Sequence, residues 1–189
     1  MTRAVPVGPA FEQRHYDDPI VVELIDALQG EYVRRYGGPD DTPVDPRAFD
    51  PPAGVFLVLR LGTDVVAGGG WRRVEPPTTA ESPERSLATA ESPERSLATA
   101  ELKRMYVLTT ARRRGLARAL LIELERRATA AGIERIILHT GTEQPEAMSL
   151  YETTGYLPMT PFGPYADAPK SRFYAKRLTP AGIRPKRGS

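Results

Sequence analysis

One short segment of this sequence combines small residues, arginines and the start of a predicted helix, a combination that favours phosphate binding. It reads Val107-Leu-Thr-Thr-Ala-Arg-Arg-Arg-Gly-Leu-Ala-Arg118, a strand that turns into a helix. Gly115 and Ala117 are small, which lets a ligand approach the backbone closely. The first amides of a helix have no intrahelical partner, and the helix dipole adds positive potential around them. With the neighbouring arginines, this turn predicts a site for a pyrophosphate group.

Two common nucleotide-binding motifs do not match this turn. No Gly-Lys-Ser/Thr follows, so it is not a Walker loop, and the glycine triplet of a dinucleotide fingerprint is missing. The alternative is a basic helix start that lies in solvent or binds nucleic-acid phosphates without specificity. The apolar stripe of the helix and the lack of interleaved aromatic residues argue against nucleic-acid binding, so we expect no nucleic-acid partner.

A second segment, Gln144-Pro-Glu-Ala-Met-Ser-Leu-Tyr-Glu-Thr-Thr-Gly-Tyr156, predicts a helix with Ala147, Leu150 and Tyr151 on one side. The two segments together resemble the signatures of the GNAT superfamily of N-acetyltransferases, of the bacterial, acetyl-CoA-dependent type. Arg112-x-x-Gly115-x-Ala117 is similar to the Gln/Arg-x-x-Gly-x-Gly/Ala signature. Ala147-x-x-Leu150-Tyr151-x-x-x-Gly155-Tyr156 is similar to the second signature. The resemblance covers roughly Val55 to Leu178.

The resemblance implies a fold and a set of cofactor contacts. The fold is an α/β (α+β) domain with a mixed, mostly antiparallel sheet, in which two central parallel strands splay apart to admit acetyl-CoA. Backbone groups of Met105, Tyr106 and Val107 would bind the pantetheine arm as an extra strand does. The pyrophosphate would lie against Arg112 and the amides of the turn. Gln144 stands where many relatives have Asn. The implied cofactor-binding residues are Met105, Tyr106, Val107, Arg112, Arg113, Arg114, Gly115, Leu116, Ala117, Arg118 and Gln144.

The resemblance also places Tyr151 near the thioester sulfur, where its chemistry suits a general acid. Acetyl transfer to an amine proceeds by attack of the neutral amine on the carbonyl, and a thiolate leaves. A phenol with a pKa of about 10 is protonated at neutral pH and can give its proton to a thiolate of about 8.5. The alternative is a tyrosine that only packs its helix against the sheet.

The amine must also lose a proton, and two residues are candidate bases. Glu101 begins the strand before the phosphate turn, where several relatives place a carboxylate that acts through water. We expect Glu101 to be the base, although a solvated residue at the end of a strand is the alternative. His139, at the end of the next strand, is a rival base, and a packed or hydrogen-bonded histidine is the alternative there.

The composition excludes several classes of site. The chain of 189 residues has no cysteine, which excludes disulfides, thiolate nucleophiles and cysteine zinc sites. Its two histidines lie far apart in sequence, so we expect no metal. No signal peptide or long apolar segment is present, which predicts a cytoplasmic protein without membrane contact.

The patterning elsewhere predicts the elements that position these residues. Pro39 to Pro52 is rich in proline and predicts a loop with a short helical turn near Asp45. The alternation of strands and helices in the middle of the chain predicts a right-handed crossover. Helices are expected at residues 18–36, 115–131 and 145–154, and strands at 55–59, 65–71, 102–108, 136–138, 156–157 and 172–178.

A perfect ten-residue repeat, TAESPERSLATAESPERSLATAE, occupies Thr79 to Glu101. One apolar residue per unit cannot build a core, and known repeat folds need about 20 to 50 residues per unit. We therefore expect a neutral duplication that lengthens a surface loop. The expected organisation is a single domain over residues 1–178, with residues 79–100 as a loop insertion and residues 179–189 as a basic tail.

These features predict an N-acetyltransferase that acts on the primary amine of a small molecule, an amino acid or a peptide or protein. The alternative is a non-catalytic acyl-CoA-binding or regulatory module that kept the cofactor cleft. Acceptor specificity is expected to come from the N-terminal helices and the loops, where Tyr32, Tyr36, Trp71 and the Pro161–Tyr165 loop are candidates to line the pocket. A plain core or turn role is the alternative for each of them. Related proteins are often dimers, so a homodimer is the assembly that the resemblance suggests.

Overall fold

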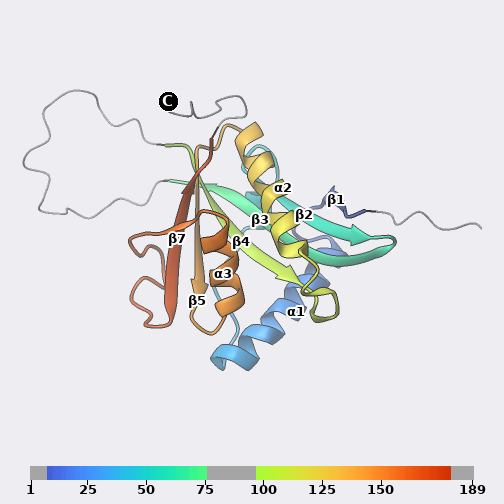
Figure 1. The fold of residues 1–189 in the computed structure, drawn as a ribbon, viewed down its shortest axis with the longest axis horizontal. Coiled ribbons are helices and arrows are strands. Elements are labelled where there is room, and N and C mark those ends of the chain that lie inside the picture. Colours follow the sequence, from blue (N-terminus) through green and yellow to red (C-terminus); the bar gives the residue numbers. More distant parts are fainter. Residues whose placement is uncertain (1–7, 76–96, 180–189) are drawn as a thin grey trace, which may run out of the picture.

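The computed structural model describes residues 8–75 and 97–179, folded around one seven-stranded sheet with the strand order β1-β2-β3-β4-β5-β7-β6 (Figure 1). The predicted helices and strands are confirmed, and one short edge strand, β1, was not predicted. The elements are β1 (Ala10–Gln13), α1 (Pro19–Tyr36), η1 (Pro46–Phe49), β2 (Gly54–Leu61), β3 (Asp64–Val74), β4 (Thr99–Val107), η2 (Thr109–Ala111), α2 (Leu116–Ala130), β5 (Arg135–Gly141), α3 (Pro145–Thr153), β6 (Leu157–Pro158) and β7 (Ser171–Arg177).

Local sequence explains where the longest helix begins and ends. The Asp18 side chain caps α1 by accepting a hydrogen bond from the Ile20 amide at 2.9 Å, and Pro19 occupies the first turn. Gly37 ends the helix in the left-handed conformation, with φ of 83°, which glycine adopts without steric cost.

The sheet is mixed and mostly antiparallel, as the fold class predicted. The only parallel pair between described strands is β4–β5, and it extends only from Thr99 to Leu102 on β4, opposite residues 135–138 of β5. Both strands continue beyond that point, β4 to Val107 and β5 to Gly141, without further pairing to each other. The two central strands therefore separate toward the end of β4 that leads into α2.

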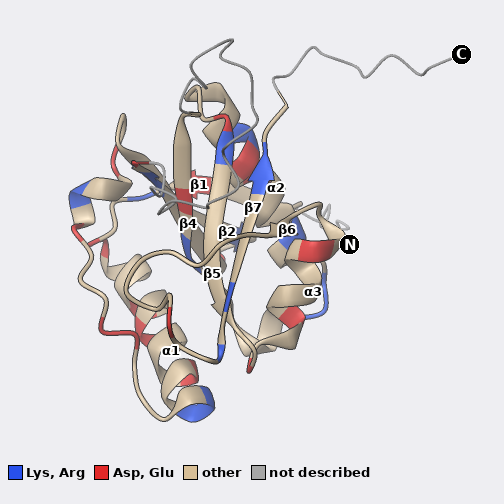
Figure 2. Ribbon diagram, turned by 90° about the vertical axis from the view of Figure 1, so that its left-hand side faces the viewer, with Lys and Arg blue, Asp and Glu red and all other residues tan. Residues whose placement is uncertain are grey.

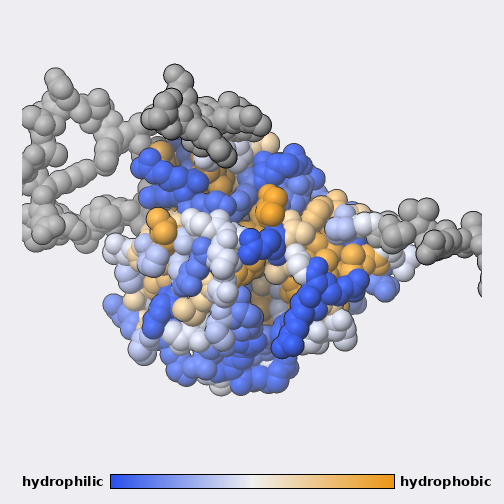
Figure 3. Space-filling model, viewed as in Figure 1, coloured by the Kyte–Doolittle hydropathy of each residue, from blue (hydrophilic) through white to orange (hydrophobic). Residues whose placement is uncertain are grey.

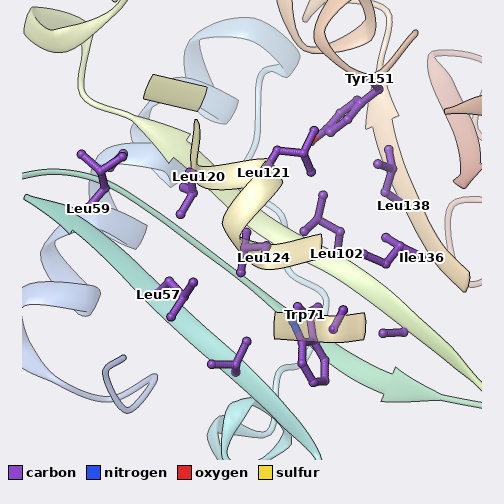
Figure 4. Packing of buried hydrophobic residues seen from close by; sticks show 14 of the residues in the cluster. Leu57, Leu59, Trp71, Leu102, Leu120, Leu121, Leu124, Ile136, Leu138 and Tyr151 are labelled. Atoms are coloured by element: carbon purple, nitrogen blue, oxygen red, sulfur yellow. The ribbon is translucent and has the colours of Figure 1, made fainter. Parts of the chain in front are cut away.

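The sheet has a helical layer on each face, because its buried residues alternate. Val55, Leu57 and Leu59 of β2 belong to the larger apolar cluster, whereas Phe56 and Val58 belong to the smaller one. The larger cluster includes residues of α2 and α3, and the smaller one includes residues of α1. Figure 4 shows the first of these clusters, with Leu120, Leu121 and Leu124 of α2 above the strands.

A bulge interrupts β4 at the point where it leaves β5. The register between β3 and β4 shifts between Gly68 and Gly70, so that Arg104 and Met105 together oppose Gly69. Arg104 has φ of 58°, which is unusual for a residue with a side chain. A Cβ on Gly69 would lie 2.7 Å from Met105 Cγ and 3.1 Å from Met105 Cα, so only glycine fits opposite the bulge.

The predicted loop insertion and tail fall largely outside the described residues. Residues 79–96 of the repeat and residues 180–189 of the tail are not described. Within the described part, Thr99 and Ala100 are buried and begin β4. The strand therefore starts three residues before the predicted Leu102, because Thr99 to Leu102 pair with β5.

The surface of the described residues is largely hydrophilic in the view of Figure 3, with small separate apolar areas. Basic and acidic residues are interspersed along the chain rather than gathered on one face (Figure 2). No helix among residues 8–75 and 97–179 has the length and apolar character needed to cross a membrane.

Candidate functional site

A cavity of about 280 Å³ lies where β4 and β5 separate. Its walls come from both helical layers: Tyr32 and Tyr36 belong to α1, and Ala147 and Tyr151 belong to α3. The separated strands contribute the remaining central wall, and the segment before β7 closes one side. From the strands and this segment, the lining residues include Glu101, Leu102, Lys103, Arg104, Met105, His139, Thr140, Gly141, Tyr165, Lys170 and Ser171.

Tyr151 lines this cavity from the α2–α3 side of the sheet. Figure 4 shows its ring pointing from α3 toward Leu121 of α2, beside Leu138 of β5. The residue is 7% exposed, and among the described residues no group hydrogen-bonds to its hydroxyl. Burial raises the pKa of the Tyr151 phenol above its usual value, with a smaller contribution from Tyr32 of α1. Tyr151 is therefore a protonated phenol that faces the gap between the strands.

Glu101 lies on the opposite face of the sheet, because it neighbours Leu102, which points into the larger cluster. Its carboxylate is buried and held by two cations. The Arg72 guanidinium donates two hydrogen bonds to Glu101 Oε2, at 2.8 and 3.1 Å. Lys103 Nζ lies 3.2 Å from Oε1. The structure thus places the predicted base at the cavity, with an ion-pair partner on each oxygen.

His139 lies on the same face as Glu101, and its ring is fixed on three sides. It stacks on Tyr165 with ring centroids 5.1 Å apart and on Phe173 with centroids 5.0 Å apart. Its Nε2 lies 3.0 Å from Ser171 Oγ. Burial, and to a smaller extent the charge of Lys103, lowers the pKa of His139 below its usual value, so the imidazole is neutral at neutral pH.

The predicted phosphate turn is open at the start of α2. Gly115 has φ of 74°, and a Cβ on it would meet nothing within 4 Å. The first amide to bond back into the helix is that of Ala119, at 3.0 Å from the Gly115 oxygen. The amides of Leu116, Ala117 and Arg118 precede it and have no helical acceptor. Arg113 and Arg114 are exposed beside this helix start.

The side chain of Arg112 is occupied elsewhere. Its Nε donates to the Val107 carbonyl at 3.0 Å, and its Nη2 pairs with the buried Glu31 of α1. The guanidinium also lies over the Tyr106 ring, 5.4 Å from the centroid. Arg112 therefore fastens the turn to α1 through its side chain.

The remaining predicted cofactor residues lie along the separated strand and at the start of α3. Met105 to Val107 belong to the part of β4 that does not pair with β5, although the Val107 carbonyl already accepts a hydrogen bond from Arg112 Nε. Gln144 occupies the N-cap position of α3 without a side-chain capping hydrogen bond, and it lines the cavity. Its Oε1 lies 3.4 Å from both the Tyr36 and the Thr140 hydroxyl oxygens.

A second cavity adjoins the first and shares Glu101, Lys103, His139 and Tyr165 with it. The predicted specificity residues Tyr32, Tyr36 and Tyr165 line the first cavity, and Phe162 lines the second. Trp71 does not line either one. It is 2% exposed within the larger apolar cluster, because its neighbour Arg72 takes the cavity face.

Sequence reasoning missed four charged residues of the cavity, Asp40, Lys103, Arg104 and Lys170. Arg104 Nη1 lies 2.8 Å from Asp40 Oδ2, and the Arg104 side chain is 4% exposed. Asp40 Oδ1 also accepts a hydrogen bond from the Tyr165 hydroxyl at 2.9 Å. No sequence pattern indicates these contacts, since the bulge that turns Arg104 toward Asp40 depends on pairing with β3. No cluster of three or more potential metal ligands occurs in residues 8–75 and 97–179.

The arrangement places a phenol on one side of the gap and a carboxylate and an imidazole on the other. Tyr151 lies on one side of the gap between β4 and β5, and Glu101 and His139 lie on the other. A reacting group held in the gap would meet the phenol from one face of the sheet and a base from the other. The open start of α2 follows β4 in the chain, and the short helix η2 connects the two.

Comparisons with known proteins identify a family and relatives of this chain. The sequence profile of the acetyltransferase (GNAT) family matches residues 21–156. A protein of Azospirillum brasilense named IAA acetyltransferase is 42% identical over 77 residues, which are 41% of this chain and only half of that protein. An Escherichia coli protein named uncharacterized N-acetyltransferase YjgM is 28% identical over 166 residues, which are 82% of this chain and 86% of that protein.

The fold also matches solved structures. A Klebsiella pneumoniae protein assigned to the acyl-CoA N-acyltransferases superposes with a TM-score of 0.66 and 24% identity, over 91% of this chain and 99% of that chain. At this level of identity the likeness concerns the fold.

Proposed function

Since the chain belongs to the GNAT family of acetyltransferases, we propose that it transfers an acetyl group from acetyl-CoA to a primary amine. The observation that carries this proposal is the separation of β4 from β5 beside Tyr151, because it opens a cavity between the two helical layers. Acetyl-CoA supplies an acyl group activated as a thioester. The residues of this chain bind it, orient it and move the protons.

Three features of the chain suit coenzyme A. The open start of α2 offers the amides of Leu116, Ala117 and Arg118 to the pyrophosphate, and no Cβ at Gly115 blocks them. Arg113 and Arg114 add positive charge at the same place. The edge of β4 that does not pair with β5, from Met105 to Val107, offers backbone groups to the pantetheine arm, apart from the Val107 carbonyl that Arg112 occupies. Arg112 contributes by fixing the turn to Glu31.

Tyr151 supplies the proton that the leaving thiolate needs. Its burial keeps the phenol protonated, and its hydroxyl has no partner among the described residues that would compete for the proton. A thiolate buried beside Tyr151 would also have a raised proton affinity, because burial disfavours the charged form of any group. Proton transfer from Tyr151 to sulfur thus remains feasible although its pKa is raised.

The acceptor amine enters from the face that α1 and the segment before β7 enclose. Tyr32, Tyr36 and Tyr165 give this side of the cavity an aromatic character, and Lys103 and Arg104 place charge in it. We propose a small molecule, an amino acid or the amino end of a peptide as the acceptor class.

Two measurements test this function. Calorimetry with acetyl-CoA is expected to show binding, and release of free thiol is expected when a panel of primary amines is added. If acetyl-CoA binds but none of the amines in the panel causes thiol release, a non-catalytic acyl-CoA-binding module would be favoured. Absence of binding would reject the proposal, because the open start of α2 would then have another role.

A further inference from the structure

The two candidate bases of the cavity differ in what surrounds them. Both Glu101 and His139 line both cavities and lie on the face opposite Tyr151. An amine that approaches from the α1 face would reach either side chain. The difference lies in the partners that each already has.

The oxygens of Glu101 are engaged by cations. Oε2 accepts two hydrogen bonds from Arg72, and Oε1 lies 3.2 Å from Lys103 Nζ. The Glu101 side chain is 8% exposed, and those of Arg72 and Lys103 are 25% and 12% exposed. Both oxygens of the carboxylate thus already have a cationic partner. Glu101 is therefore well placed to hold Arg72 and Lys103, and an amine would meet oxygens that are already engaged.

His139 has one ring nitrogen engaged and one without a partner. Nε2 lies 3.0 Å from Ser171 Oγ, and no described residue hydrogen-bonds to Nδ1. Tyr165 and Phe173 both stack on the ring and fix its plane. If Nε2 carries its hydrogen toward Ser171, the lone pair of Nδ1 is free to accept a proton.

We infer that His139 accepts the proton of the attacking amine, and that Glu101 is a positioning residue that holds Lys103 and Arg72. This inference rests on the proposed acetyl transfer. It replaces the assignment of the base to Glu101 that we expected from the sequence.

The proton balance of the step is complete with these groups. The lone pair of the neutral amine forms the new bond to the carbonyl carbon, and the carbon–sulfur bond breaks with its electron pair on sulfur. The nitrogen then loses a proton to Nδ1 of His139, and the sulfur gains the hydroxyl proton of Tyr151. The products are an amide and a free thiol. Solvent afterwards removes the proton from His139 and restores the one on Tyr151.

The charges around His139 suit this task. Lys103 of β4 disfavours the charged imidazole, whereas Asp40 and Glu101 favour it more weakly than burial opposes it. Lys170 and Tyr165 of the segment before β7 also line the cavity. The resting imidazole is therefore neutral, which a proton acceptor must be before each turnover.

The pH dependence of kcat tests the assignment, with both substrates saturating so that titration of the free amine does not contribute. For the unmodified chain, kcat should fall as pH decreases through the pKa of His139. His139→Gln should lower kcat by about 100-fold and abolish this acid limb, with unchanged acetyl-CoA binding in calorimetry. Glu101→Gln should lower kcat less than His139→Gln does and keep the limb. A His139→Gln variant with near-normal kcat or with its acid limb intact would overturn the inference.

Lys103→Met provides a directional control. Removing this positive charge should raise the pKa of His139, so the acid limb should move to higher pH. A limb that does not move in this variant would mean that another group titrates.

A spectroscopic test does not depend on finding the acceptor. The chain has only two histidines, so His15→Gln leaves His139 as the single imidazole in a nitrogen-15 NMR spectrum. At neutral pH we expect a neutral ring with its hydrogen on Nε2. A hydrogen on Nδ1, or a charged ring, would overturn the inference. If no amine releases thiol, the proposed function fails, while this spectrum still decides whether Nδ1 is free to accept a proton.

Discussion

The guanidinium of Arg112 pairs with the buried carboxylate of Glu31, which lies 81 residues earlier in the chain. Arg112 is the first residue of the phosphate-binding signature, and Glu31 belongs to α1 on the other face of the sheet. Glu31 also pairs with Arg35 at 2.7 Å. The turn proposed to bind the pyrophosphate is thus fastened to α1, the helix that lines the proposed acceptor side of the cavity.

This pairing predicts a stability defect in Arg112→Ala. The variant leaves Glu31 buried with only Arg35 as a partner. We therefore expect the free energy of unfolding to fall by about 2 kcal/mol, which is less than the ~3–5 kcal/mol lost when a buried charge has no partner at all. Denaturant titration measures the change. Arg113→Ala, at the exposed neighbouring position, should change the free energy of unfolding by no more than about 0.5 kcal/mol. Equal losses in both variants would contradict a structural role for Arg112.

The exposed arginines of the turn should affect cofactor affinity. Replacing both Arg113 and Arg114 by Ala should raise the dissociation constant of acetyl-CoA by about tenfold, because two charges beside the pyrophosphate are lost. Calorimetry at several salt concentrations should show a weaker salt dependence than in the unmodified chain. Arg126→Ala, farther along α2 and paired with Glu123, is the matched control and should bind normally. Equal loss in the control would mean that overall charge, and not the turn, attracts the cofactor.

Tyr151→Phe should separate turnover from binding. Removing the hydroxyl deprives the leaving thiolate of its proton donor, so we expect turnover to fall by about 100-fold, within the usual range for a general acid. The packing of the ring against Tyr156, with centroids 5.5 Å apart, should be retained. Thiol release and acetyl-CoA calorimetry measure the two effects. Unchanged turnover would remove the proton-donor role.

Two glycine substitutions should have opposite effects on stability. Gly69→Ala forces a Cβ to within 2.7 Å of Met105 Cγ, so the bulge of β4 must move. We expect the free energy of unfolding to fall by about 1–3 kcal/mol, as it does at overpacked sites. Turnover should also fall, because Met105 lines the cavity. Gly30→Ala, inside α1, has only an ordinary contact at 3.5 Å with Arg34 and should stabilise by about 0.5–1 kcal/mol. Thermal unfolding of both variants compares the two sites, and a stable Gly69→Ala protein would argue against a tight bulge.

Deletion of one ten-residue copy, Glu91 to Ala100, should leave turnover intact. Because the repeat is perfect, the deleted chain still reads Leu-Ala-Thr-Ala before Glu101, so the buried start of β4 keeps its residue types. Halving a loop changes its closure entropy by only about 0.6 kcal/mol. Thiol release and melting temperature check this expectation, and a large loss of turnover would show that the second copy has a role.

Much of the fold could be predicted because its signals are local. The cap at Asp18, the apolar stripe of α2 and the glycine that ends α1 each act within a few residues, and the predicted elements are confirmed. Strand β1 was missed because its four residues carry little pattern of their own and are ordered by pairing with β2. The early start of β4 was missed for the same reason, since pairing with β5 holds Thr99 in the sheet.

The sequence by itself determined which residue types stand at the turn before α2, on α3 and at the ends of β4 and β5, and two motifs sufficed to predict the family. The tertiary structure decided what those side chains contact. In the folded chain Arg112 pairs with Glu31, and Glu101 pairs with Arg72 and Lys103. His139 stacks on two aromatic rings, and its Nδ1 has no described hydrogen-bond partner. The physical reason is range: periodicity and capping act over one or two turns, whereas these contacts join residues that only the completed sheet brings together.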